Sequence, residues 1–214
     1  MKIGILGSGN AGQTLGSALI RRGHEVKLGT RSPGKLEPWL AEHDPSLASV
    51  GEFRDAAAFG QVLINATAGD GSIAALHAAG SDSLNGKILL DISLPLDFST
   101  GMLTLSIANT DSLGERIQRE FPQVKVVKTL NTVTSALMVD PLGLADGEHH
   151  LFVSGNDDAA KREVQAFLAD WFGWKHVLDI GDISSARGTE MLLALSSRIY
   201  GALGHMNFNL RVVQ

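Results

Sequence analysis

Three glycines follow the first apolar run of the chain, residues 2–6, and a helical pattern opens with them. In a strand–turn–helix unit this spacing allows a tight turn, lets a pyrophosphate approach the backbone, and leaves helix N–H groups free for phosphate. A glycine-rich turn that binds nothing is the alternative, and the flanking strand and helix patterns count against it. The predicted dinucleotide-binding residues are Gly7, Ser8, Gly9, Asn10, Ala11 and Gly12.

The end of the second apolar run, residues 25–28, indicates which dinucleotide binds. NAD sites usually carry Asp or Glu about 20 residues beyond the glycines, where it accepts from the ribose hydroxyls. Residues 28–35 contain no acid; instead Arg31 could pair with a 2′-phosphate, Thr30 and Ser32 could donate to it, and Lys35 adds a second charge. The sequence therefore predicts NADP(H) as the cofactor.

Short apolar runs alternate with helical patterns over most of the chain. This alternation predicts an α/β fold of Rossmann type, with a doubly wound, mostly parallel sheet. Ser112 and Glu115 have the spacing of a capping box, which predicts a helix start at Ser112. The expected strands are residues 2–6, 25–28, 61–66, 87–92, 124–128, 149–154 and 176–180, and the expected helices 11–22, 34–43, 52–59, 72–79, 112–121 and 158–172.

The last stretch, residues 185–211, has a different pattern. Apolar residues recur there at spacings of three or four, which predicts a long helix or a broken helix pair. We expect it to cover a sheet edge or to form a dimer contact. We therefore divide the chain into a Rossmann domain, residues 1–182, and a small helical part, residues 183–214, that is not an independent domain. The apolar positions are Met191, Leu195, Ile199, Leu203, Met206 and Leu210.

Composition excludes several other classes of protein. The net charge of −5 argues against broad nucleic-acid binding. The chain has no cysteine, which excludes disulfides and thiolate metal sites and agrees with a cytoplasmic location. No apolar stretch is long enough for a membrane span, and we expect neither a signal peptide nor a metal site.

Further segments give the chain a resemblance to a known family. The chain resembles the NADPH-dependent coenzyme F420 reductase family over nearly its whole length, on these segments together with the glycine turn and Gly29-Thr30-Arg31. The segments are Asn65-Ala66-Thr67, Asp91-Ile92-Ser93-Leu94-Pro95-Leu96, Val127-Lys128-Thr129-Leu130-Asn131-Thr132-Val133 and Val153-Ser154-Gly155-Asn156-Asp157-Asp158.

The resemblance implies a homodimer in which hydride passes directly between NADP(H) and the deazaflavin F420, in a cleft beside the helical part. Leu94 stands where many relatives have Asn, and Thr134 and Ser135 where some have Pro and Ala, so a flavin or another acceptor remains an alternative. By matched position, Ala66, Thr67 and Ala68 flank the dinucleotide, Ser93, Leu94 and Pro95 border the nicotinamide, and Asn131, Thr132, Val133 and Met206 line the second pocket.

Hydride transfer between two bound rings needs alignment and exclusion of water more than a catalytic side chain. His205, beside Met206, is the one histidine we would test as a proton donor. Asp91 ends a strand, where it could serve catalysis or cap a turn. His149 and His150 should point to opposite faces of a strand, so they cannot easily chelate one ion.

Two other functions stay open. The chain could be a non-catalytic NADP(H)-binding redox sensor, or it could reduce a small organic substrate. Imine and β-hydroxyacid reductases share the amino-terminal half, but they usually carry a large helical domain. Only about thirty residues follow Asp182 here, which counts against these reductases.

Overall fold

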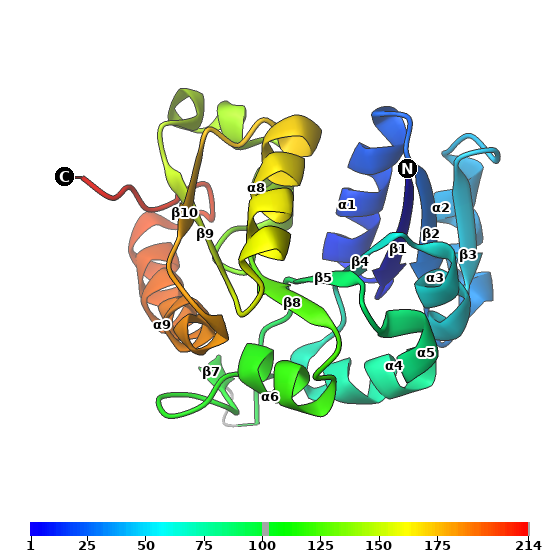
Figure 1. The fold of residues 1–214 in the computed structure, drawn as a ribbon. Helices are drawn as coiled ribbons and strands as arrows, with labels where there is room; N and C mark the ends of the chain where they lie inside the picture. The colour runs from blue at the N-terminus through cyan, green and yellow to red at the C-terminus, as the bar shows by residue number, and fades with distance from the viewer. Residues whose placement is uncertain (100–102, 214) are drawn as a thin grey trace.

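The protein folds around one eight-stranded sheet with helices on both faces (Figure 1). The computed structural model describes residues 1–99 and 103–213. The strands of this sheet are β1 (Lys2–Leu6), β2 (Glu25–Gly29), β3 (Ala48–Gly51), β4 (Val62–Asn65), β5 (Ile88–Asp91), β8 (Lys125–Lys128), β9 (His150–Gly155) and β10 (His176–Asp179). A separate two-stranded ribbon pairs β6 (Leu96–Asp97) with β7 (Thr104–Leu105).

The helices follow the predicted alternation closely. Longer ones are α1 (Asn10–Arg21), α3 (Phe53–Phe59), α4 (Ser72–Ala79), α6 (Leu113–Glu120), α8 (Asp158–Phe172) and α9 (Ala186–Leu203). Short ones are α2 (Glu37–Ala41), α5 (Ser81–Leu84), α7 (Ser135–Val139) and the 3-10 turns η1 (Pro33–Leu36), η2 (Gly69–Gly71), η3 (Pro141–Gly143), η4 (Ala145–Gly147) and η5 (Ile183–Ser185).

The strand order confirms the doubly wound topology. It runs β10-β9-β8-β5-β4-β1-β2-β3, and every neighbouring pair is parallel except β8 with β9. The chain therefore moves outward from β1 in one direction and from β4 in the other. The crevice at this switch point, beyond the carboxyl ends of the strands, is where ligands bind in such sheets.

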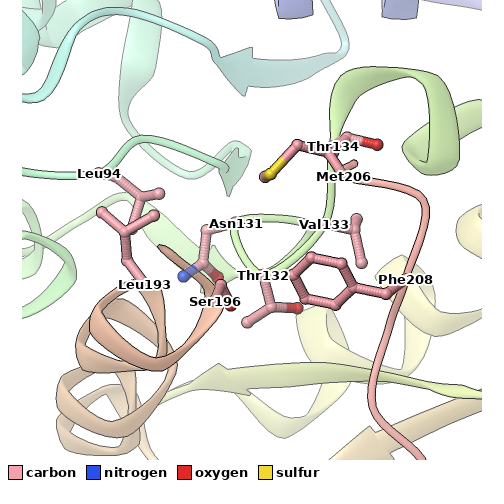
Figure 2. A pocket seen from close by; sticks show the side chains of 9 residues that line it. All are labelled: Leu94, Asn131, Thr132, Val133, Thr134, Leu193, Ser196, Met206 and Phe208. Carbon is pink, nitrogen blue, oxygen red and sulfur yellow. The ribbon is translucent and has the colours of Figure 1, made fainter. Parts of the chain in front are cut away.

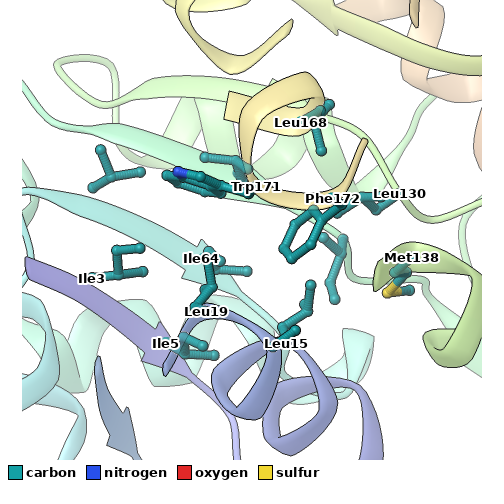
Figure 3. Packing of buried hydrophobic residues seen from close by; sticks show 14 of the residues in the cluster. Ile3, Ile5, Leu15, Leu19, Ile64, Leu130, Met138, Leu168, Trp171 and Phe172 are labelled. Carbon is teal, nitrogen blue, oxygen red and sulfur yellow. The ribbon is translucent and has the colours of Figure 1, made fainter. Parts of the chain in front are cut away.

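Two apolar layers hold the sheet between its helices. On one face, buried side chains of α1, such as Leu15 and Leu19, and of α8, such as Trp171, form one apolar layer with alternate residues of the strands (Figure 3). On the other face, buried residues of α3, α4 and α6 form the second layer. Burial of both strand faces explains why the strands read as continuous apolar runs.

The carboxyl-terminal helix is shorter than the predicted segment. α9 ends at Leu203 because Gly204 adopts a left-handed conformation (φ 74°) and stops the helix. The chain then runs beside the start of β9, where the His150 N–H donates to the Leu210 carbonyl at 2.9 Å. No helix in the described part of the chain is both long enough and apolar enough to cross a bilayer.

The sequence analysis missed one strand and described one helix start only in part. The edge strand β3 was not predicted, because its Ala-Ser-Val-Gly sequence is short and weakly apolar. The predicted start of α6 is confirmed, since the Ser112 side chain accepts from the Glu115 N–H. The reciprocal bond of a capping box is not made: Ser112 N donates to Asp111, and Glu115 pairs with Arg187.

Candidate dinucleotide and acceptor sites

The turn between β1 and α1 uses its three glycines in different ways. Gly7 has φ 120° and donates its N–H to the Gly29 carbonyl at 2.9 Å. A Cβ on Gly12 would lie 2.2 Å from the Gly7 carbonyl oxygen, whereas a Cβ on Gly9 would meet nothing within 4 Å. Gly7 and Gly12 are therefore required by the turn itself, and Gly9 leaves open space above it.

A cavity of about 480 Å³ lies over this turn, at the carboxyl ends of β1, β2 and β4. Eight predicted residues line it: Gly7, Ser8, Gly9, Thr30, Arg31, Ala66, Thr67 and Ala68. The sequence analysis missed six more lining residues, from α3, η2 and α4: Phe53, Asp70, Gly71, Ala74, Ala75 and Ala78. The small residues at 66–78, directly after the β4 pattern, are the signal that could have found most of them.

The hydroxyl groups around Thr30 are fixed, and the cation beside them is accessible. Thr30 is buried, and its Oγ1 accepts from Ser8 Oγ at 2.9 Å and from the Ser32 N–H at 3.3 Å. Arg31 is exposed at the rim of the cavity. Ser32 and Lys35 are exposed too, but neither lines the cavity.

A second, smaller cavity lies beside the loop that follows β8 (Figure 2). It holds about 100 Å³, and two of its polar atoms, Asn131 Nδ2 and Thr132 Oγ1, are buried without a hydrogen-bond partner among the described residues. The four predicted residues Asn131, Thr132, Val133 and Met206 all line it. The remaining lining residues are Leu94, Thr134, Leu193, Ser196 and Phe208.

The two cavities are neighbours because the strap of residues 93–95, which follows β5, runs between them. Leu94 lines the second cavity, and its carbonyl oxygen would lie 2.0 Å from a Cβ on Gly69, directly after the Ala68 of the first. On the α1 side, Asn10 Nδ2 donates to Ser135 Oγ at 2.5 Å. Asn10 thus tethers the glycine turn to the loop of the second cavity rather than lining the first.

Other predicted positions lie outside both cavities. Ala11 and Gly12 belong to the first turn of α1, and Ser93 and Pro95 are buried in the strap. His205 is exposed and lines neither cavity.

Asp91 has no access to either cavity. It is fully buried, forms a salt bridge with Lys128, and its Oδ1 accepts from Ser93 Oγ at 2.6 Å, so its observed role is structural. His149 and His150 lie apart as expected: His149 packs on Trp174, and His150 stacks on His176. No metal-binding group of His, Asp and Glu is present among the described residues.

Similarity to known proteins agrees with this geometry. A family model described as NADP oxidoreductase, coenzyme F420-dependent, matches residues 2–95. A crystal structure from Arthrobacter sp. FB24, provisionally named an F420-dependent NADP reductase, is 52% identical and covers 100% of both chains with a TM-score of 0.95. The chain belongs to the F420-dependent NADP oxidoreductase family.

More distant relatives of this F420-dependent NADP oxidoreductase family member are larger proteins. Metalloreductase STEAP3 of Rattus norvegicus is 31% identical over 194 residues, which are 89% of this chain and 36% of the relative. The chain thus spans about a third of the length of the curated metalloreductases it matches. An imine reductase from Myxococcus stipitatus in complex with NADP⁺ shares the fold at 19% identity, with a TM-score of 0.68 over 95% of this chain and 64% of that one.

Two glycine substitutions should separate ligand binding from folding. Gly9→Ala places a methyl group in open space, so we expect an unchanged melting temperature and about tenfold weaker NADPH binding, because the pyrophosphate can no longer approach the backbone. Gly12→Ala drives its Cβ against the Gly7 carbonyl and should lower stability by about 1–3 kcal/mol. Calorimetric titration and thermal melts check both; unchanged NADPH affinity in Gly9→Ala would place the pyrophosphate elsewhere.

Proposed function

We propose that this protein transfers hydride directly between NADP(H) and a flavin-like acceptor, either the deazaflavin F420 or a flavin. The observation that carries the proposal is the pair of adjoining cavities at the switch point of the sheet. One has the features of a dinucleotide site. The other is mainly apolar and contains two unpartnered polar groups.

The first cavity suits NADP(H) in both shape and charge. The open space above Gly9 admits a pyrophosphate, and the amino end of α1 supplies N–H groups toward it. Arg31, beside the fixed hydroxyls of Ser8 and Thr30, would bind the 2′-phosphate of the adenosine ribose. Ser32 and Lys35 do not line the cavity, so they would act on the 2′-phosphate only from outside it.

The second cavity would receive the edge of the acceptor ring. The Asn131 amide and the Thr132 hydroxyl would bind polar atoms of that edge, because buried donors without partners favour a ligand that supplies acceptors. Leu94, Val133, Met206 and the other apolar walls would exclude water. When both ligands are bound, NADPH supplies a hydride from its nicotinamide and the acceptor ring takes it up.

The size of the second cavity supports one alternative substrate. Its 100 Å³ is below the roughly 300–1,000 Å³ typical of pockets that enclose a small molecule. A three-ring acceptor would therefore keep part of its ring outside the cavity. A small organic substrate, held by Asn131 and Thr132, would instead fit within it.

The acceptor can be identified by following NADPH oxidation by absorbance while adding coenzyme F420, FMN, FAD or small carbonyl compounds. Rapid oxidation with F420 or a flavin would support the proposal. Turnover with a small carbonyl compound alone would mean that the acceptor is a small organic substrate and not F420 or a flavin. Tight NADPH binding without turnover by any acceptor would overturn the reductase proposal in favour of a redox sensor.

We also propose that residues 183–214 act as an appendage to the Rossmann domain of residues 1–182, and that two copies of the protein associate through it. The predicted apolar stripe of α9 faces solvent: Met191, Leu195 and Leu203 are 37%, 51% and 50% exposed. Burying such a stripe against a second copy would remove its apolar surface from water. Light scattering should then give about twice the chain mass of 22.7 kDa, and a monomer at micromolar concentration would contradict the dimer.

A further inference from the structure

A buried cluster of three charges joins the sheet to the carboxyl-terminal helix. Lys128, the last residue of β8, forms salt bridges with Asp91 at the end of β5 (Nζ–Oδ2, 2.9 Å) and with Glu190 on α9 (Nζ–Oε1, 2.8 Å). Their side chains are 0%, 0% and 1% exposed. None of the three lines either cavity, so direct contact with the proposed ligands does not explain them.

Every charge in the cluster is satisfied. Burial lowers the pKa of Lys128, but the carboxylates of Asp91 and Glu190 outweigh this effect and raise the pKa above its usual value, so the ammonium stays charged. Asp91 Oδ1 also accepts from Asn65 Nδ2 at 2.8 Å. Glu190 accepts from the first two N–H groups of α6, those of Leu113 at 2.8 Å and Gly114 at 3.0 Å.

Three walls of the second cavity connect to this one ammonium. Lys128 Nζ also donates to the Ser93 carbonyl, which fixes the strap residue immediately before Leu94. Glu190 lies one turn before the cavity residue Leu193 on α9. The third wall is the loop that begins directly after Lys128 and carries Asn131, three residues beyond it, and Thr132.

The same network reaches the first cavity. Asn65, which donates to Asp91, also accepts from Thr67 Oγ1 at 2.7 Å, and Thr67 lines the proposed dinucleotide site. A continuous line of hydrogen bonds, buried from Asn65 onward, therefore runs from the first cavity to α9.

We infer that Lys128 is a positioning residue for the acceptor cavity: together with Glu190 it fixes the separation between Leu94 and α9, and therefore the opening that admits the acceptor. The inference rests on the proposed function. The Lys128 ammonium is sealed from both cavities. Lys128 therefore acts through Ser93 and Glu190 and does not donate a proton to the substrate.

The test uses Glu190→Gln, because Lys128→Met would leave two buried carboxylates without a cation and could unfold the protein. The amide keeps the size of the side chain but loses the charge that holds Lys128. Glu115→Gln is the matched control: it removes the salt bridge between α6 and α9, Glu115 to Arg187 at 2.6 Å, without touching the strap. Hydrogen exchange followed by mass spectrometry, NADPH affinity and acceptor kinetics are measured for both variants.

In Glu190→Gln we expect faster exchange in both α9 and the strap of residues 93–95, and an acceptor KM raised about tenfold. The dissociation constant for NADPH should stay within about twofold of the wild type. In Glu115→Gln we expect faster exchange at the start of α9 only, with unchanged kinetics. The strap is the decisive segment because Glu190 reaches it only through Lys128.

Two results in Glu190→Gln would overturn the inference. One is faster exchange confined to α9. The other is an NADPH dissociation constant that rises by the same factor as the acceptor KM. If the wild type turns over no acceptor, the proposed function fails. The exchange of the strap then decides by itself whether Lys128 holds the two walls together.

Discussion

Replacing Lys128 with Met will lower the free energy of unfolding by about 3–5 kcal/mol, among the largest losses that one substitution causes. Asp91 and Glu190 would remain buried, with their attractive partner replaced by an apolar group. Removing one ion from a buried pair costs much more stability than the intact pair contributes, because the remaining group is left buried without a charge partner. Urea denaturation followed by tryptophan fluorescence measures the loss.

Lys161→Met is the matched control for this prediction. Lys161 is also buried, at 5% side-chain exposure, and also has two carboxylate partners. Those partners, Asp158 and Asp179, are 77% and 40% exposed, so water solvates them once the lysine is gone. We expect a loss of about 1 kcal/mol or less from the ion pairs. Equal losses in the two variants would show that burial of the carboxylates does not govern the effect.

Replacing Arg31 with Ala will weaken NADPH binding about 10- to 100-fold and leave NADH binding nearly unchanged. The guanidinium would pair with the 2′-phosphate that only NADPH carries, and a hydrogen bond to a charged group contributes about 1.5–3 kcal/mol. Thr30 and Ser8, hydrogen-bonded to each other, would still hold their hydroxyls near the phosphate. Titration followed by nicotinamide fluorescence gives both dissociation constants.

Lys35→Ala serves as the control for the arginine. Lys35 lies on η1 outside the cavity lining, so its removal should weaken NADPH binding much less. Similar losses for NADPH and NADH in Arg31→Ala would mean that Arg31 contacts the adenine or pyrophosphate instead. In that case the preference for NADP(H) would have to come from another cation.

The two cavities are lined by different parts of the chain, and this difference affects which hydride acceptor the protein could bind. The first cavity is formed by the turns that follow β1, β2 and β4 and by residues of α3, η2 and α4. The second cavity, where we propose that the acceptor binds, is lined by the strap, the loop after β8, α9 and the terminal segment. Changes in α9 or the terminal segment could therefore alter the acceptor while the NADP(H) site stays the same.

Local patterns in the sequence were sufficient for the fold class and, together with the family resemblance, for eight of the residues that line the first cavity. The glycine turn, the strand before it and the helix after it are contiguous, so their spacing directly encodes the turn geometry. Helices α4 and α8 were predicted with their observed bounds; each ends directly before a glycine, Gly80 or Gly173, that has a positive φ angle. Asn131 to Val133 and Met206 came from the family resemblance, and all of them line the second cavity.

Only the tertiary structure decided which distant residues pair in the core and which face of α9 is covered. Lys128 and Asp91 are 37 residues apart, and nothing in the sequence around either indicates that the ends of β5 and β8 adjoin and that Glu190 closes over them. The apolar stripe of α9 predicted contact with a sheet edge or with a second copy of the chain. Within one chain the stripe is largely exposed, because periodicity identifies an apolar face without naming its partner. Charge pairing and burial depend on which distant elements meet, and that is set by the packing of the whole sheet.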